Sequence, residues 1–241
     1  MIRAWTGLVA LSLSAACEPP KPNIERHDNG TLKSQIVMRN GQRHGDWVAW
    51  YSNGQKRSEG SYAEGRREGP WVYWHRNGTK RSQGEVLNDR KTGLWTSWRA
   101  NGNKKEEGHY SAGKPNGPHT FWYPSGRREK VIGYKGCSHH GRQTLWFKNG
   151  QLHAQGQLVE GIKEGLWEEW YPSGIKRHAL TFVAGVLAPN TRYWNRQGEP
   201  VDSIAVACDD HEEHEVHGLP CGIAKPATAP PQKQQQPAQT K

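Results

Sequence analysis

The sequence predicts an all-β protein, an elongated single-layer antiparallel meander of 24-residue β-hairpin repeats. Three observations support this fold: a glycine column, a tryptophan column of the same period, and Asn-Gly or Ser-Gly pairs between short segments rich in β-formers. The glycine column contains Gly30, Gly54, Gly78, Gly102, Gly126, Gly150, Gly174 and Gly198. The tryptophan column contains Trp50, Trp74, Trp98, Trp122, Trp146, Trp170 and Trp194. Columns this regular are typical of a repeat array.

Composition and charge taken alone favour disorder. The 241-residue chain has a formal net charge of +10 and 33% hydrophobic residues, so it can bury little apolar surface. Against this stand 12 Trp, 8 Tyr and 28 Gly, many of which fall in register with the repeat. We therefore predict a folded array of about seven hairpins over residues 29–200.

Each repeat unit is expected to be one hairpin. The pair Asn53-Gly54 and its equivalents suit a two-residue type I′ turn, in which both central residues need a positive φ. The Gly-x-x-x-Gly segments, such as Gly65 to Gly69, are expected to turn the chain back into the next unit.

A two-residue loop at Asn53-Gly54 fixes the pairing of the flanking strands. Trp50 then faces Arg57, where a cross-strand cation–π contact is expected, and the ring of Trp47 covers Gly60. The equivalent expected pairs are Trp74 with Arg81, Trp98 with Lys105, Trp170 with Arg177, Trp71 with Gly84, and Trp95 with Gly108.

Equivalent residues of neighbouring hairpins should lie two strand spacings apart, about 9–10 Å. The tryptophans then form ladders that serve either as core packing or as a binding surface. The Lys/Arg pairs that follow each turn form a basic stripe, which is either a solvated face or a surface for an anionic polymer. The candidate ligand-binding residues are Trp50, Arg57, Trp74, Arg81, Trp98, Lys105, Trp122, Trp170 and Arg177.

The pattern G-x-W-x-x-W-x-x-N-G, then a glycine and an aromatic residue, then G-x-x-x-G, resembles the MORN-repeat variant of bacterial proteins. The resemblance covers about residues 26 to 200 and implies a twisted antiparallel sheet that serves as a non-catalytic binding scaffold. Some members of that family are labelled antitoxin components of toxin–antitoxin systems. The departures from the pattern are His119 and Gln143 in place of the first Trp, and Asp89 and Cys137 in place of a loop glycine. We expect these units to be looser or locally specialised.

Residues 1–17 resemble a lipoprotein-type signal peptide. Arg3 precedes an apolar stretch from Ala4 to Leu13, and small residues precede Cys17, which would be the acylated first residue of the mature chain. Ordinary secretion and a chance apolar start are the alternatives. Residues 18–28 fit a short tether. The chain is therefore expected to be exported and held at the cell membrane or outer membrane through its lipid.

Residues 201–222 form a Cys/His-rich segment in which the repeat fades, and residues 223–241 form a Pro/Gln-rich tail expected to be disordered. A disulfide between Cys208 and Cys221 is the favoured interpretation, because an exported chain meets an oxidising compartment. The alternative is a zinc site, whose ligands would come from Cys208, His211, His214, His217 and Cys221.

No catalytic constellation is predicted, and no cofactor. The segment Gly108 to Lys114 matches the start of a phosphate-binding loop, but Pro115 stands where Ser or Thr is required. The expected function is a membrane-anchored, non-catalytic scaffold for protein–protein interaction, with an antitoxin-like role as one form of it. The alternative is a module that binds a cell-envelope glycan or anionic polymer. A nucleic-acid partner is not expected.

Overall fold

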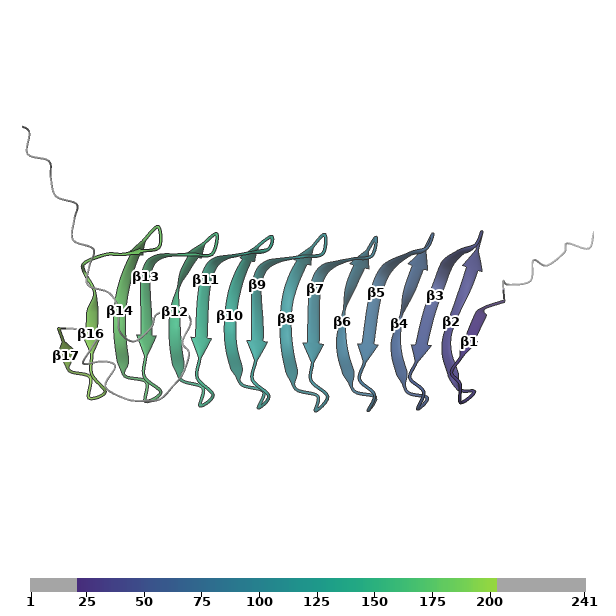
Figure 1. The fold of residues 1–241 in the computed structure, drawn as a ribbon, viewed down its shortest axis with the longest axis horizontal. Helices are drawn as coiled ribbons and strands as arrows, with labels where there is room; N and C mark the ends of the chain where they lie inside the picture. Colours follow the sequence, from purple (N-terminus) through teal and green to yellow (C-terminus); the bar gives the residue numbers. More distant parts are fainter. Residues whose placement is uncertain (1–20, 203–241) are drawn as a thin grey trace, which may run out of the picture. The chain divides into compact units, whose positions relative to one another are not determined.

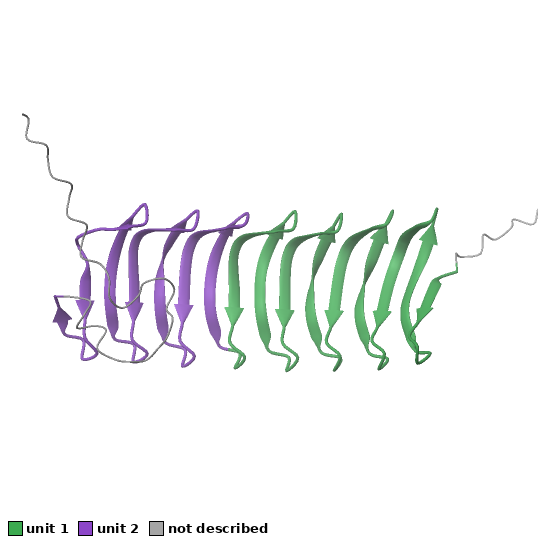
Figure 2. Ribbon diagram, viewed as in Figure 1, with its two compact units in different colours: residues 1–126 green, residues 127–241 purple. Residues whose placement is uncertain are grey.

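The structure, a computed structural model, describes residues 21–202. These residues form 17 β-strands, and no segment among them is helical. The all-β meander predicted from the repeat is confirmed, since consecutive strands pair antiparallel from β1 to β9 and from β10 to β15. The chain divides into two compact units, the first ending at Gly126 and the second beginning at Arg127 (Figure 2).

Unit 1 is a single layer of nine strands in sequence order (Figure 1). Its strands are β1 Asn23–Arg26, β2 Leu32–Arg39, β3 Gln42–Trp50, β4 Lys56–Ala63, β5 Arg66–Trp74, β6 Lys80–Leu87, β7 Arg90–Trp98, β8 Lys104–Ser111 and β9 Lys114–Trp122. Each strand from β1 to β8 pairs with the next one along the chain.

Unit 2 repeats this arrangement with eight strands (Figure 1). Its strands are β10 Arg128–Lys135, β11 Ser138–Trp146, β12 Leu152–Val159, β13 Ile162–Trp170, β14 Lys176–Val183, β15 Val186–Leu187, β16 Arg192–Trp194 and β17 Pro200–Val201. The regular hairpins end at β14, which pairs with both short strands β15 and β16.

Two kinds of turn alternate along the chain. The two-residue type I′ turn that was predicted within each hairpin is found between hairpins instead. The two-residue turns lie between hairpins: Glu64 and Gly65 both have positive φ, 48° and 80°, as a type I′ turn requires. At Asn53-Gly54 the loop has three residues instead. The N–H of Gly54 donates to Tyr51, the N–H of Tyr51 donates to Gln55, and of the pair only Gly54 has a positive φ. The predicted type I′ turn at Asn53-Gly54 is therefore wrong, although the chain does reverse there.

The longer loop changes the register at the end of each hairpin. In β3 and β4 the predicted pairing holds from Gly45–Tyr62 to Ala49–Ser58, and a bulge then pairs Trp50 with Lys56. Trp50 therefore does not face Arg57. The same shift pairs Trp74 with Lys80, Trp98 with Lys104, and Trp170 with Lys176.

The column asparagine connects neighbouring hairpins. Asn53 accepts a hydrogen bond from the N–H of Gln55 within its own loop, and its Nδ2 donates to the carbonyl of Arg76 in the next loop, 3.0 Å away. Equivalent bonds run from Asn29 to Ser52, from Asn77 to Ala100 and from Asn149 to Pro172. Asparagine thus serves here to join successive loops rather than to adopt a left-handed backbone.

Each core ring lies on a glycine of the preceding strand. Trp71 pairs with Gly84 along the backbone, as predicted, but the glycine that its ring covers is Gly60. A methyl group at Gly60 would lie 2.4 Å from that ring. The predicted cover of Gly60 by Trp47 is wrong because the β4–β5 register shifts beside Gly60 and brings Trp71 onto it. The other ring–glycine pairs are Trp95 on Gly84, His119 on Gly108 and Trp167 on Gly156.

The departures from the tryptophan pattern are well packed. His119 is 0% exposed, and its Nε2 donates to the carbonyl of His109, the bond that the Trp95 indole makes to Glu85. At Gln143 the ring is lost, but its backbone partner is the buried Ile132 where the pattern has glycine. Looser packing, one of the two expectations for these units, is therefore not seen at His119 or around Ile132.

Candidate functional site

The candidate tryptophans of the column that begins at Trp50, here called the second column because they occupy the second tryptophan position of each repeat, are half-buried. The cations beside them are not the predicted ones. Lys56 lies over Trp74 with Nζ 5.7 Å from the ring centroid, and Lys104 lies over Trp122 at 5.3 Å. In unit 2, Lys176 lies 5.6 Å from Trp170. The bulge pairs Lys56 and Lys104 with Trp50 and Trp98 along the backbone, yet each lysine lies over the tryptophan of the next hairpin. Lys176 lies over both its backbone partner Trp170 and Trp194.

These lysines are already paired with carboxylates. The Nζ atoms of Lys56 and Lys104 lie 2.8 Å from Glu59 and 2.7 Å from Glu107. The hydrogen bond from Lys104 lowers the pKa of Glu107, so this pair stays charged near neutral pH. Lys176 likewise contacts Glu168 at 2.6 Å. The second tryptophan column thus carries largely neutralised cations.

A second set of cations lies over the buried aromatic rings, and sequence reasoning missed it. Arg43 lies over Trp47 and Tyr62, Arg67 over Trp71, Lys91 over Trp95 and Tyr110, and Lys163 over Trp167 and Phe182. All four occupy the same position of the 24-residue repeat. That recurrence was visible in the sequence, but only the bulged register shows which rings these cations reach.

Two of these cations are partly removed from water. Burial lowers the pKa of Lys91, and the charge of Glu106 offsets part of that effect. Burial likewise lowers the pKa of Lys163, with Glu169 opposing it. Within residues 21–202, neither ammonium group lies within 4.0 Å of a carboxylate.

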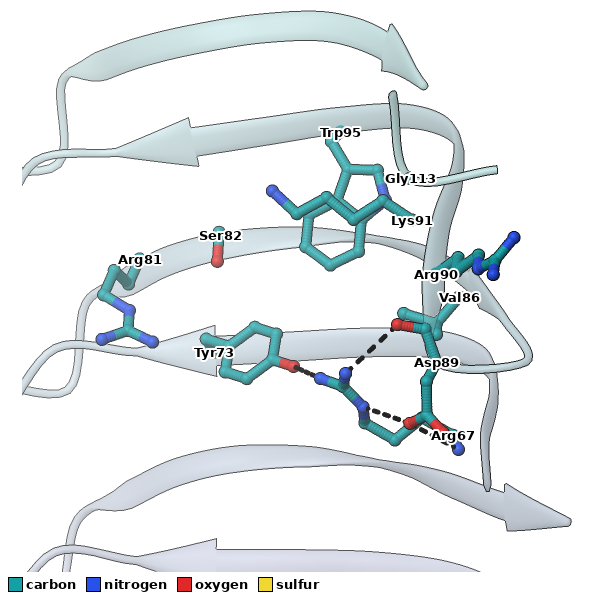
Figure 3. Close-up of a pocket in the computed structure, with 10 residues that line it drawn as sticks. All are labelled: Arg67, Tyr73, Arg81, Ser82, Val86, Asp89, Arg90, Lys91, Trp95 and Gly113. Carbon is teal, nitrogen blue, oxygen red and sulfur yellow. Dashed lines mark hydrogen bonds and ion pairs between the residues drawn. The ribbon is translucent and has the colours of Figure 1, made fainter. Parts of the chain in front are cut away.

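Lys91 lines a hollow of unit 1, about 500 Å³, which lies over β5, β6 and β7 (Figure 3). Figure 3 shows its side chain extended across the ring of Trp95, whose centroid is 4.4 Å from Nζ. Arg81 lies at the other end, with its guanidinium carbon 5.5 Å from the ring of Tyr73. The remaining lining residues are Arg67, Ser82, Val86, Asp89, Arg90 and Gly113.

Asp89, which departs from the glycine pattern, shapes one wall of this hollow. Its Oδ1 accepts from Nε of Arg67 at 2.9 Å, its carbonyl accepts from the same guanidinium, and Tyr73 accepts the third bond at 3.3 Å. This contact raises the pKa of Arg67 and lowers that of Asp89. Both Asn88 and Asp89 have positive φ, 50° and 64°. The turn is therefore locally specialised, and it fixes Arg67 while Arg81, Arg90 and Lys91 have no ion pair within the described residues.

Unit 2 has a smaller hollow of about 320 Å³ on β13, β14 and β16. It is lined by Leu166, Glu168, Lys176, Ala179, Thr181, Asn190, Arg192 and Trp194. Its lysine is bound to Glu168 and lies over two tryptophans. Neither of the candidate ligand-binding residues of unit 2, Trp170 and Arg177, lines this hollow.

Several predicted sites lie outside the described residues. These are the acylatable Cys17 and the Cys/His-rich segment with Cys208, His211, His214, His217 and Cys221. Within the part of the chain that the structure describes, no group of three or more His, Cys, Asp or Glu side chains is placed to hold a metal ion. Cys137 is exposed and has a free thiol. Residues 21–202 include no helix of the length and apolar character needed to cross a membrane.

The MORN repeat variant model matches residues 43–64 and residues 91–112. These segments hold the β3–β4 and β7–β8 hairpins almost whole. No curated protein matches the chain. The two matched segments begin at the same position of the repeat, two periods of 24 residues apart. Two of the hairpins of this chain are thus similar to the MORN repeat variant.

Proposed function

We propose that the chain is a non-catalytic scaffold that binds another protein. The observation that carries the proposal is the burial of the first tryptophan of each repeat: Trp71, Trp95 and Trp167 are 2%, 6% and 5% exposed. Rings that cover the backbone of the preceding strand stabilise the sheet and have no free face for a sugar. The aromatic ladder is therefore better explained as the core of a binding platform than as a glycan-binding surface.

The polar surface of the sheet suits protein recognition. Asn53 and its equivalents join consecutive loops. The N–H of Gly65, in a between-hairpin turn, donates to the carbonyl of Arg43 in β3, next to the preceding turn of the same kind. These bonds recur along each unit and limit the freedom of one hairpin against the next. Side chains on such a surface are held at regular spacing, which lowers the entropy cost of binding a partner.

The proposal extends to where the scaffold acts. Acylation at Cys17 would hold it at a membrane, with the residues between Cys17 and β1 as the tether, since residues 23–26 of the expected tether form β1. The resemblance to proteins labelled as antitoxin components makes the product of a neighbouring gene the first candidate partner. Support for both comes from the sequence patterns alone.

The alternative function, binding of an envelope glycan or anionic polymer, is favoured by a different observation. Trp50, Trp74 and Trp98 are only half-buried, and lysines lie beside this column. A half-exposed ring next to a cation can contact a sugar ring and an acidic substituent together.

Binding to envelope material separates the two functions. The full-length chain is incubated with envelope fractions of the cells that make it, before and after protease digestion of those fractions. A protein partner predicts that protease abolishes capture and that chemical crosslinking yields one discrete adduct. Capture that survives protease but is lost after glycosidase treatment would favour the glycan alternative and overturn the scaffold proposal.

The membrane anchor is tested separately with Cys17→Ser. The substituted chain is expected to leave the membrane fraction and to lose metabolically incorporated fatty acid. Unchanged partitioning would refute the anchor and leave the scaffold proposal standing.

A further inference from the structure

Unit 1 carries a row of exposed cations that lack carboxylate partners within the described residues. Arg57 on β4, Arg81 on β6 and Lys105 on β8 occupy the same repeat position and are absent from every ion pair found in residues 21–202. Their sequence neighbours Lys56 and Lys104 do have carboxylate partners. The positive charges of this row are therefore available to pair with a ligand.

The row has a spacing that selects one peptide conformation. Its members are two strands apart in a layer of consecutive strands, which corresponds to about 9.4–9.8 Å. A polyproline II helix has three residues per turn and rises about 3.1 Å per residue, so side chains on one side repeat every ~9.3 Å. In an extended β-strand, side chains on one side repeat every ~6.8 Å and fall out of step after one position. A polyproline II chain that runs across the strands therefore matches the row at every third residue.

The middle of the row is the hollow over β5, β6 and β7. Arg81 lies at one end of it. The ammonium group of Lys91, which is partly buried and has no ion pair within the described residues, extends across the ring of Trp95 toward the Arg81 end (Figure 3). A carboxylate placed there would meet both cations away from bulk water, where a charge pair is stronger than at an open surface. The half-buried ring of Tyr73 forms an apolar wall of the kind that proline rings pack against.

We propose that unit 1 binds an acidic, proline-rich segment of the partner protein in the polyproline II conformation, with a carboxylate at every third residue. The carboxylates pair with Arg57, Arg81 and Lys105, and the central one also approaches Lys91. The inference rests on the proposed function and names the chemistry of the partner. The Pro-rich tail of this chain does not fit, because residues 223–241 contain three lysines and no acidic residue.

The test uses the full-length chain and a fluorescent peptide of five Pro-Pro-Glu triplets, followed by fluorescence anisotropy at low salt. The first control peptide carries Gln in place of Glu. The second has the same composition, with its five glutamates contiguous. The triplet peptide is expected to bind at least about tenfold tighter than either control. Equal affinity for the triplet and contiguous peptides would overturn the proposal, because only total charge would then matter.

A pair of variants tests the row itself. Arg57→Gln, Arg81→Gln and Lys105→Gln together are expected to weaken binding about tenfold, the sum of several exposed ion pairs. The matched control removes three equally exposed cations at the between-hairpin turns, Arg39, Arg66 and Lys114, by the same change to Gln. The control is expected to bind within about twofold of the wild-type chain. Equal losses in both variants would contradict a defined row.

Competition distinguishes the peptide from other anions. Polygalacturonate and inorganic polyphosphate are added to the peptide complex at matched charge. Displacement no better than by sodium chloride at the same ionic strength is expected. Displacement at low concentration would overturn the proposal in favour of a polyanion. If no peptide binds but capture of envelope protein remains protease-sensitive, the acidic segment is refuted and the scaffold function stands.

Discussion

The two units share one backbone plan and build their cores from different side chains. Unit 1 centres on Trp71, Val86 and Trp95, with four more aromatic residues packed against them. Unit 2 centres on Leu158, Trp167, Leu180 and Phe182. The number of rings thus falls from unit 1 to unit 2, while strands β10 to β14 keep the lengths that strands β2 to β9 have in unit 1.

The difference shows that a ring and the glycine beneath it act as one packing element. Where the glycine is retained, as at Gly84, the ring lies flat on the backbone and is buried. Where the glycine is replaced by Ile132, the ring is replaced as well, by Gln143. Trp47, which has Ile36 as its backbone partner, keeps its ring but is only partly buried. An aliphatic side chain and a buried ring do not fit together at this position.

The between-hairpin turns show a second contrast. The residues beside these turns in unit 1 include Arg39, Arg66, Arg90 and Lys114. At the last two turns of unit 2 the equivalent positions are Val159, Ile162, Val183 and Val186, and all four are at least 40% exposed. Ile162 also lies against Gly185 of the neighbouring turn. The last turns of unit 2 thus expose aliphatic side chains at positions where several turns of unit 1 expose cations.

The largest predicted effect comes from filling the space under a ring. Gly84→Ile should destabilise the protein by about 3 kcal/mol, because the new Cβ would lie 2.4 Å from the ring of Trp95. Urea unfolding followed by tryptophan fluorescence measures the free energy of unfolding. Gly102→Ala is the control: its Cβ meets nothing within 4 Å, so only the positive φ costs energy, about 1 kcal/mol. Equal losses in the two variants would contradict the packing argument.

The next effect is pH-dependent and belongs to unit 2. Burial would raise the pKa of Glu169, but the contact with His178, 3.0 Å away, together with the positive charge of Lys163, outweighs it and leaves the pKa lowered. A lowered folded-state pKa contributes stability that is present above the unfolded pKa, roughly pH 4–5, and is lost as the pH falls through the folded value. Glu169→Gln should therefore cost about 1–3 kcal/mol at pH 7.

The same reasoning makes the cost of Glu169→Gln vanish in acid. Unfolding curves of the wild-type chain and the variant at several pH values between 7 and 3 should converge at the acidic end. Glu164→Gln is the control, because it removes a carboxylate from the same strand away from His178, and it should cost less at pH 7 than Glu169→Gln. A wild-type advantage that persists unchanged at pH 3 would refute the sign of the shift.

A smaller effect is expected at the loop asparagines. Asn53→Ala removes the bond to Gln55 and the bond to Arg76 of the next loop, and should cost about 1–2 kcal/mol. Asn101→Ala is the matched comparison, because the bond seen for Asn101 stays within its own loop, to Asn103. Its cost should be about half as large. A cost for Asn101→Ala that equals or exceeds that of Asn53→Ala would refute the link between hairpins.

The smallest effect is predicted for restoring the glycine at position 89. Asp89→Gly relieves a positive φ of 64° at a non-glycine residue and removes an exposed ion pair with Arg67. The relieved backbone strain and the lost ion pair are each worth about 1 kcal/mol or less and oppose each other, so the free energy of unfolding should change by less than about 0.5 kcal/mol. Calorimetry of both chains measures this, and a loss above 2 kcal/mol would show that Asp89 holds the turn together.

The fold was predictable because the period itself specifies it. Columns at Gly54 and Trp50 located every hairpin and most of the strand pairing. The turn types were not predictable, since Asn-Gly is compatible with both a two-residue and a three-residue loop, and only the bulge beside Trp50 distinguishes them. That one-residue difference also makes Lys56 rather than Arg57 the backbone partner of Trp50, while the ring that Lys56 covers is that of Trp74 in the next hairpin.

The candidate site was predictable only in part. The row of Arg57, Arg81 and Lys105 follows from the repeat, but its lack of ion pairs depends on side-chain geometry. The contact between Arg67 and Asp89 joins the same two repeat positions as the backbone bond from Gly65 to Arg43, 22 residues apart, and Asp89 adds a carboxylate where the pattern has glycine. A break in a column was therefore the signal for a local specialisation.

A double-mutant cycle at Gly84 and Trp95 tests most directly whether ring and glycine form one element. Gly84→Ile, Trp95→Gln and the double variant, which reproduces the pair at Ile132 and Gln143, are compared by urea unfolding. If the account is correct, the double variant is more stable than Gly84→Ile alone, with a coupling of at least about 2 kcal/mol. Additive losses, with no recovery in the double variant, would contradict it.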